Sequence, residues 1–297
     1  MTKKSAPHRH HYIPRMILRN FLNTEGGLYF WRREFRIGDV KATKPENLFL
    51  EDDLYTIIDD DGGRDVSIEI GFAKLESVGA PFIATILDNV RIGQTPILSE
   101  NASEFLAHFH YYSAKRSAAW HRRFVGRDEV LAVVKKIAQE PRWTEEQRAW
   151  MWDTPDLDRV MNNARIAAQG TGPTDELLAL MRKRGMAIYL APKGASFILG
   201  DHPTAMANVG AGIRTATGKV TFMPIAFDVA IGYTHTPRKV HIEPLTRSQI
   251  RAMNEAMARQ STMIAGRSDS LIRSLSKLGY QMPEYFTSPE YLQGPMI

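Results

Sequence analysis

The sequence contains no cysteine among its 297 residues. This absence excludes disulfide bonds, thiolate nucleophiles and cysteine-based zinc sites. No stretch approaches about 18 consecutive apolar residues, the length that a membrane-spanning helix requires. The first residues are charged and histidine-rich rather than apolar, so they do not resemble a secretion signal. We therefore expect a cytoplasmic protein that makes no membrane contact.

Several catalytic motifs are absent as well. The chain has no G-x-G-x-x-G after a predicted strand, no G-x-S-x-G and no H-E-x-x-H. These absences argue against a dinucleotide-binding Rossmann fold, a hydrolase with a serine nucleophile elbow and a zinc metalloprotease.

Acidic residues are missing from the start of the chain, where none precedes Glu25. The formal net charge is +5, a modest excess that favours contact with anions over contact with cations. Basic residues cluster within 3–19 and again within 115–123, and an acidic stretch at 51–61 separates the two clusters. The charge pattern is compatible with nucleic acid or another phosphate-bearing ligand as a partner, but an excess of this size needs no nucleic acid to explain it. It leaves the oligomeric state open.

A short helix is predicted from about 14 to 22. Pro14 suits the start of a helix because its missing N–H would have no partner there, and the apolar residues after it recur at three- and four-residue spacing. Arg15 and Arg19 share another face of this helix, one turn apart. Three histidines stand just before the helix N-terminus, where backbone N–H groups favour an anion.

Hydrophobic periodicity predicts the remaining elements. A two-residue period between 28 and 40 predicts a small N-terminal β-hairpin, and from 66 to 184 the period is that of helices. Strands are expected at 186–190, 196–199, 220–227 and 229–233, and helices from 246 and 269.

We expect an α+β fold, because strands and helices alternate too irregularly for a doubly wound sheet. The first two thirds are helix-rich apart from the N-terminal hairpin, and the last third combines a mixed β-sheet with helices. We expect residues 1–297 to form one domain. If a subdomain boundary exists, the Gly- and Pro-containing stretch at 170–173 is the place for it.

Two polar positions fall on predicted buried helix faces. Glu76 lies with Glu69 at one edge of an apolar stripe, where a carboxylate suits a metal ligand or a general base as well as a structural role. Arg116 shares a face with His108 and Tyr112, and its guanidinium fork can bind two oxygens of a phosphate or carboxylate. The alternative for Arg116 is a structural pairing with Glu76.

A further candidate follows a predicted buried strand, at Gly200-Asp201-His202-Pro203. Proline forces the residue before it into an extended conformation, and glycine frees the backbone on the other side. An acid presented in this way at a strand end is a common source of a catalytic carboxylate or a ligand.

The run His11-Tyr12-Ile13-Pro14, followed by Leu18-Arg19-Asn20-Phe21, resembles the opening of a bacterial family named domain of unknown function 4238. Later segments agree with the family in order. They are Phe49 through Tyr55-Thr56, Ala73-Lys74-Leu75-Glu76, the helix around Arg116, and Leu199-Gly200-Asp201-His202-Pro203. The resemblance spans most of the chain, and the family name implies no reaction.

The polar residues that the resemblance singles out divide by chemistry. The predicted catalytic and metal-binding residues are His11, Glu76 and Asp201. The predicted ligand-binding residues are Arg19, Asn20, Arg116 and His202. The first set combines ligand types that suit Mg²⁺ or Mn²⁺, and a bound metal would activate water while the arginines neutralise a phosphate. Our first hypothesis is therefore a metal-assisted phosphodiester hydrolase, such as a nuclease of a bacterial antiviral defence or toxin system.

Two alternatives stay open. In the first, the protein is a non-catalytic binding or regulatory module for an anionic ligand or nucleic acid. This alternative predicts salt-sensitive binding without turnover and without a metal requirement. Alternatively, His11 and Asn20 only hydrogen-bond the first helix to the body of the fold.

Overall fold

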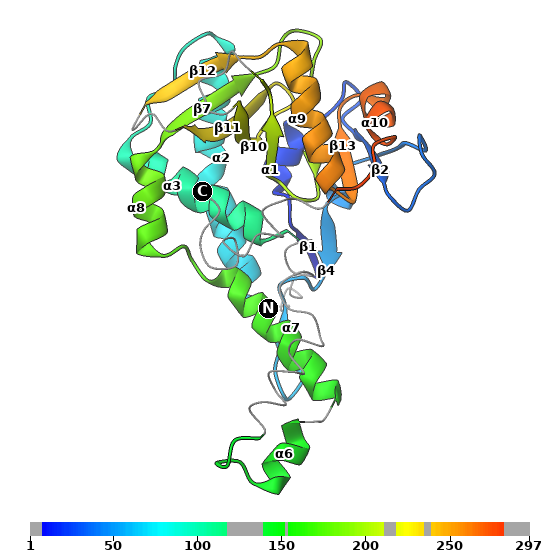
Figure 1. Ribbon diagram of the computed structural model, residues 1–297, viewed down its shortest axis with the longest axis vertical. Helices are drawn as coiled ribbons and strands as arrows, with labels where there is room; N and C mark the ends of the chain where they lie inside the picture. The colour runs from blue at the N-terminus through cyan, green and yellow to red at the C-terminus, as the bar shows by residue number, and fades with distance from the viewer. Residues whose placement is uncertain (1–7, 118–138, 152–153, 211–217, 235–238, 282–297) are drawn as a thin grey trace, which may run out of the picture.

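The computed structural model describes residues 8–117, 139–151, 154–210, 218–234 and 239–281. Its helices and mixed sheets confirm the predicted α+β fold. The two larger sheets lie in one body, and helices α7 (Thr154–Gly170) and α6 (Glu145–Met151) project from its lower end (Figure 1). Most of the basic cluster at 115–123 lies outside the described residues.

The N-terminal segment forms short elements. The predicted first helix is shorter than expected, because Pro14 directly precedes it and Asn20 ends it. The elements of this segment are β1 (Arg9–His11), α1 (Arg15–Arg19), β2 (Leu28–Arg32), β3 (Lys41–Thr43), the 3₁₀ turn η1 (Pro45–Asn47), β4 (Leu50–Asp52), β5 (Ile57–Ile58) and β6 (Arg64–Asp65). β1 pairs with β4 and β5 pairs with β6, both antiparallel.

A four-stranded antiparallel sheet joins the two ends of the chain. The predicted hairpin is present as β2 and β3, but β2 also pairs with β13 (Met263–Gly266), which in turn pairs with β8 (Leu199–Gly200). The strand predicted at 196–199 is therefore shorter and shifted. The N–H groups of Phe197 and Ile198 bond outside any sheet, to the Phe227 carbonyl and the Asn254 side chain.

A five-stranded mixed sheet forms most of the C-terminal third. Its strand order is β12-β7-β11-β10-β9, and only the β12–β7 pair is parallel. The strands are β7 (Gly185–Leu190), β9 (Ala205–Asn208), β10 (Lys219–Pro224), β11 (Val229–Thr234) and β12 (Val240–Pro244). β9 and β12, the two edge strands of this sheet, were not predicted. β7 and β11 are buried almost throughout, which indicates that both faces of the central strands are covered.

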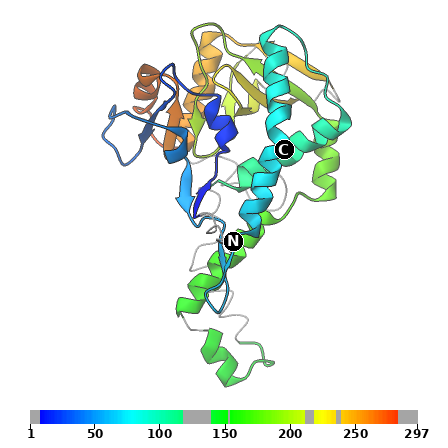
Figure 2. The ribbon, with the colours of Figure 1, turned by 180° about the vertical axis from the view of Figure 1, so that it is seen from behind.

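Helices cover these sheets. The larger ones are α2 (Ser67–Arg91), α3 (Glu100–Lys115), α8 (Asp175–Lys183) and α9 (Arg247–Gln260), and α10 (Asp269–Leu275) is shorter. Seen from behind, α2 crosses in front of the five-stranded sheet (Figure 2). Residues 171–173 connect α7 to α8, so they lie between two helices rather than between a helical and a β-rich part.

Within the described residues, α2 alone is long and apolar enough to cross a membrane by length and composition. Its buried residues include Ile83, Ile86 and Val90, which pack in the core. A core helix of a soluble protein satisfies the same criterion of length and composition.

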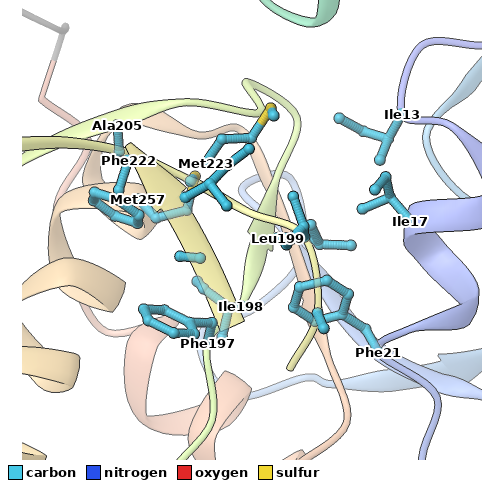
Figure 3. Close-up of a cluster of buried hydrophobic side chains, with 14 of the residues drawn as sticks. Ile13, Ile17, Phe21, Phe197, Ile198, Leu199, Ala205, Phe222, Met223 and Met257 are labelled. Atoms are coloured by element: carbon cyan, nitrogen blue, oxygen red, sulfur yellow. The ribbon is translucent and has the colours of Figure 1, made fainter. Parts of the chain in front are cut away.

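The main core is one cluster of buried side chains that includes residues from Tyr12 to Leu275. Ile13, Ile17 and Phe21 bring the first segment to this core, where they face Leu199 and Met223 (Figure 3). Fully burying an aliphatic or aromatic side chain contributes about 1.5–3 kcal/mol. The family-like opening of the chain is thus fixed to the body by its apolar face.

Candidate functional site

Arg116 follows α3 and is the largest fully buried side chain of the described residues. Its Nη1 donates to Glu76 Oε1 of α2 at 2.7 Å, and its Nη2 donates to the His11 carbonyl of β1 at 2.5 Å. Its guanidinium lies 4.7 Å from the ring centre of Phe72, and the Tyr55 hydroxyl donates to its carbonyl. Arg116 therefore ties β1, α2 and the end of α3 together, which is the structural role that stood as its alternative.

Burial opposes the charge of Arg116, but its contacts with Tyr55 and Glu76 raise its pKa above the usual arginine value. The guanidinium is thus charged at every relevant pH. Burial also raises the pKa of Tyr55, so its hydroxyl stays neutral. Glu76, whose side chain is 23% exposed, supplies the compensating negative charge.

Glu69, two turns before Glu76 on α2, is the unusual carboxyl of this cluster. Burial raises its pKa to about 7, while the charge of Arg116 lowers the pKa and the charge of Glu76 raises it. Its Oε2 is buried and has no hydrogen-bond partner among the described residues. A carboxyl of this kind changes protonation near neutral pH.

His11 is half-buried beside Arg116. Its Nε2 lies 3.3 Å from the Pro45 carbonyl, which can only accept, so this nitrogen carries the proton. Burial lowers the pKa of His11 to about 4; the Pro45 hydrogen bond opposes this shift, and the positive charges of Arg15, Arg116 and Arg9 add to it. The imidazole is therefore neutral at pH 7.

No sequence pattern indicates the role of the neighbouring His10. This side chain is fully buried, its Nδ1 accepts the Tyr55 N–H at 3.0 Å, and its ring stacks on the Tyr55 ring at 5.5 Å. His10 and Tyr55 thus extend the Arg116 cluster, and only their tertiary pairing identifies them.

Asp201 has a different set of partners. Its carboxylate accepts the Thr262 N–H at 3.0 and 3.2 Å and the Thr262 hydroxyl, in the link between α9 and β13. Burial raises its pKa, and the hydrogen bonds from Thr262 and its neighbours lower it. The adjacent His202 is also buried, and its Nδ1 donates to the Thr204 carbonyl at 2.9 Å. These contacts give both residues a structural explanation.

Two of the three predicted metal ligands contact the same residue, Arg116. His11 and Glu76 both contact Arg116, through a carbonyl and a carboxylate respectively, whereas Asp201 binds Thr262. In the described part of the chain, no group of three or more His, Asp or Glu side chains is arranged to hold a metal ion. The geometry therefore gives no support to a metal held jointly by these three residues.

The side chains of Asn20 and Arg19 lie in different environments. Asn20 Nδ2 donates to the Ile225 carbonyl at 2.9 Å, and the Asn20 carbonyl accepts the Phe227 N–H at 3.1 Å. Asn20 therefore fixes the end of α1 to the turn between β10 and β11, as the docking alternative requires. Arg19 is exposed.

A cavity of about 660 Å³ lies between α9, α10 and the loop that follows β7. We call it the arginine cavity, because Arg247, Arg251 and Arg267 line it and none of its lining residues is acidic. The other lining residues are Gly194, Ala195, Ser196, Phe227, Ile250, Asn254, Ser268, Ser270, Leu271 and Ser274.

The three arginines differ in their partners. Arg251 is neutralised by Glu255 at 2.6 Å and donates to Ser274 Oγ at 2.9 Å. Arg247 donates to the carbonyls of Lys193 at 2.8 Å and Gly194 at 3.4 Å, so its charge is hydrogen-bonded but not neutralised.

Arg267 is the least engaged of the three. Its guanidinium lies 3.9 Å from the ring centre of Phe227. It forms no hydrogen bond or ion pair with any other residue that the structure describes. Its N–H groups are therefore available to a ligand.

Only part of this cavity could be foreseen. The sequence predicts a helix that opens at Thr246 and carries Arg251 and Asn254, which both line the cavity. Arg267 joins them because β13 ends directly before it, a position that depends on the pairing of β13 with β2.

A model of the family described as "Protein of unknown function (DUF4238)" matches residues 9–270. The chain belongs to this family. The match therefore confirms the resemblance carried by the N-terminal motif. No curated protein and no solved structure matches the chain.

The DUF4238 match covers Arg116 with its partners and the three arginines of the arginine cavity, because it runs from β1 into α10. Gly200, in a run that resembles the family, has a clear structural reason: a Cβ there would meet Ser261 Oγ and approach Met257 Sδ to 2.7 Å. The close approach of β8 to the end of α9 thus requires glycine.

Proposed function

We propose that this DUF4238 protein is a non-catalytic binding module that holds an anionic ligand in the arginine cavity. The observation that carries this proposal is the combination of three guanidinium groups and no carboxylate among the lining residues. The sequence hypothesis attributed anion binding to Arg116 and the first helix. The buried hydrogen bonds of Arg116 within the protein favour the arginine cavity instead.

Charge supports this assignment. Arg247 and Arg267 form no ion pair with a described carboxylate, whereas Asp228, next to Phe227, is engaged by Arg91 at 2.8 and 3.0 Å. Two unit charges about 4 Å apart near a protein surface attract by about 4 kcal/mol. An anion that enters the cavity therefore meets two positive charges whose attraction is not cancelled locally.

Size supports it as well. Cavities that hold small molecules typically have volumes of about 300–1,000 Å³ and combine apolar walls with a few polar groups. The arginine cavity falls in this range and includes Phe227, Ile250 and Leu271 beside its arginines.

Calorimetric titration with tripolyphosphate and with citrate, at low and at high salt, tests the proposal. We expect binding that weakens with salt and is lost in an Arg247→Gln/Arg267→Gln variant. Each charged hydrogen bond removed should cost about 1.5–3 kcal/mol, or about 10- to 100-fold in Kd. Arg36→Gln is the matched control, because Arg36 is exposed and does not line the cavity. Absence of binding by either anion, or equal loss in the control, would refute the proposal.

A hydrolytic activity is the second candidate, and Glu69 is the observation that favours it. A carboxyl with a pKa of about 7 is suited to transfer protons at neutral pH, and it lies near Arg116 and Glu76. The proposed reaction is phosphodiester hydrolysis, as by a nuclease of a defence system, with Mg²⁺ or Mn²⁺ as cofactor.

Incubation of the protein with DNA, RNA and dinucleotides in the presence of either metal tests this candidate. We expect cleavage by the wild type and its loss in Glu69→Gln and His11→Ala. Intact substrates with the wild type, or cleavage that survives in Glu69→Gln, would contradict a role for this carboxyl.

A further inference from the structure

The arginine cavity holds more donors than a simple carboxylate can use. Arg267 offers the five N–H groups of its guanidinium, and Ser196, Ser268, Ser270 and Ser274 line the same cavity. Three of these serines also have partners in the fold: Ser268 Oγ accepts the Leu271 N–H at the start of α10 and shares a hydrogen bond with Ser270 Oγ, and Ser274 Oγ accepts from Arg251. A carboxylate has two acceptor oxygens and one negative charge. A phosphate monoester has three strong acceptor oxygens and a charge of about −1.5 to −2 at pH 7.

The local charge matches a dianion. Arg251 is neutralised by Glu255, which leaves the charges of Arg247 and Arg267 for a ligand. A ligand with two negative charges compensates both. Planar guanidinium forks also bind pairs of phosphate oxygens with defined geometry.

The cavity is larger than inorganic phosphate needs and is partly apolar. Phe227, Ile250 and Leu271 contribute apolar wall, and the total volume is about 660 Å³, within the range of sites for drug-sized molecules. The ligand therefore carries an organic group beside its phosphate. The three arginines converge on one cavity rather than following a groove, which distinguishes this site from one that tracks a nucleic-acid backbone.

We infer that the ligand of the arginine cavity is a small organic phosphate monoester, of the size of a sugar phosphate or a nucleoside monophosphate. This inference rests on the proposed function and specifies its ligand class. The phosphate binds Arg267 and Arg247 beside the serine hydroxyls, and the organic group lies against the apolar wall.

Calorimetric titration of the full chain with matched ligands tests the ligand class. The probes are glucose 6-phosphate, its isosteric analogue glucose 6-sulfate, and unmodified glucose, together with AMP and adenosine. We expect the phosphates to bind at least about tenfold more tightly than the sulfate, which carries one negative charge, and glucose and adenosine not to bind measurably. Tighter binding of glucose 6-phosphate or of AMP supports the class and identifies the organic group.

Variants locate the binding. Arg267→Lys keeps the charge but removes the fork, so we expect glucose 6-phosphate and AMP to bind about tenfold more weakly, while Arg36→Gln binds as the wild type does. A phosphorus NMR signal of the bound ligand that shifts in the wild type and not in Arg267→Gln gives a second readout. Unchanged melting temperatures show that the variants are folded.

The outcomes separate this inference from the proposed function. If tripolyphosphate or citrate binds but the monoesters do not, or if sulfate and phosphate bind equally, the ligand class is wrong and anion binding stands. If a single-stranded RNA oligonucleotide binds more tightly than the monoesters through the same arginines, the inference of a small ligand is overturned. If no anion binds, the proposed function itself fails.

Discussion

Replacing Arg116 by methionine should destabilise the protein severely. The change removes a charged hydrogen bond of 2.7 Å to Glu76 and another of 2.5 Å to the His11 carbonyl, both made by a side chain that is only 2% exposed. Hydrogen bonds to charged groups contribute about 1.5–3 kcal/mol each, and breaking a buried ion pair on one side costs about 3–5 kcal/mol. We therefore expect Arg116→Met to lower the free energy of unfolding by about 3–5 kcal/mol.

Urea unfolding at neutral pH measures this loss, with the slope of the transition used to check that the unfolded state is unchanged. Arg142→Met is the matched control, because Arg142 pairs with Glu140 at 2.8 Å on the surface, with side chains 66% and 45% exposed. Surface pairs contribute about 0–1 kcal/mol. A loss below about 1 kcal/mol for Arg116→Met, or equal losses in the two variants, would show that the buried cluster does not hold β1, α2 and α3 together.

Three further changes test other contacts. Glu69→Gln should leave the free energy of unfolding nearly unchanged at low pH and raise it above that of the wild type near pH 8. Folding raises the pKa of Glu69 from 4.5 to about 7. The stability that Glu69 contributes is therefore present below its unfolded pKa and is lost as the pH rises through the folded value. Urea midpoints across this range measure the difference, and a gap that does not change with pH would contradict the assigned pKa. Asn20→Ala should lower the free energy of unfolding by about 1–3 kcal/mol in the same assay, because the Ile225 carbonyl loses its side-chain donor. The control Asn101→Ala changes an exposed residue and should have little effect. Equal effects would disprove the docking role of Asn20. Gly200→Ala should destabilise the protein by about 1–3 kcal/mol through overpacking against Met257. Its control, Gly71→Ala in α2, has open space at the new Cβ and should stabilise the protein by about 0.5–1 kcal/mol. Melting curves measure both changes, and shifts of the same sign would refute this packing argument.

The predictability of the fold followed the strength of the local signals. The helical periodicity from 66 onward and the helices expected from 246 and 269 predicted α2, α3, α9 and α10, which the structure contains. β9 and β12 were missed because both are short edge strands, whose stability depends on packing and pairing with neighbouring strands rather than on a local pattern. The N-terminal hairpin was predicted, but its third neighbour β13 lies at the other end of the sequence and has no local signal.

The candidate site was predictable only in its components. Helical spacing placed Glu76 and Arg116 on buried faces, and the suggested pairing between them is present. Spacing cannot show which residue from another element meets a side chain, so the contact of Asp201 with Thr262, 61 positions away, was not foreseen. The arginine cavity combines side chains from four separate segments of the chain, and only the completed sheets bring these segments together. Metal dependence, hydrolysis, partners and cellular location stay predictions.

The sheet that joins β2 to β13 has a consequence for how the chain folds during synthesis. Arg33, directly after β2, donates its Nε to the Ser261 carbonyl, and these residues are 228 positions apart. A ribosome that adds about 5–20 residues per second therefore exposes β2 for roughly 10 seconds or longer before its central partner exists. Contacts of such high sequence separation also slow folding after release, because loop closure must precede the stabilising pairing. The nascent protein thus presents an incomplete sheet edge to its surroundings until β13 has been synthesised.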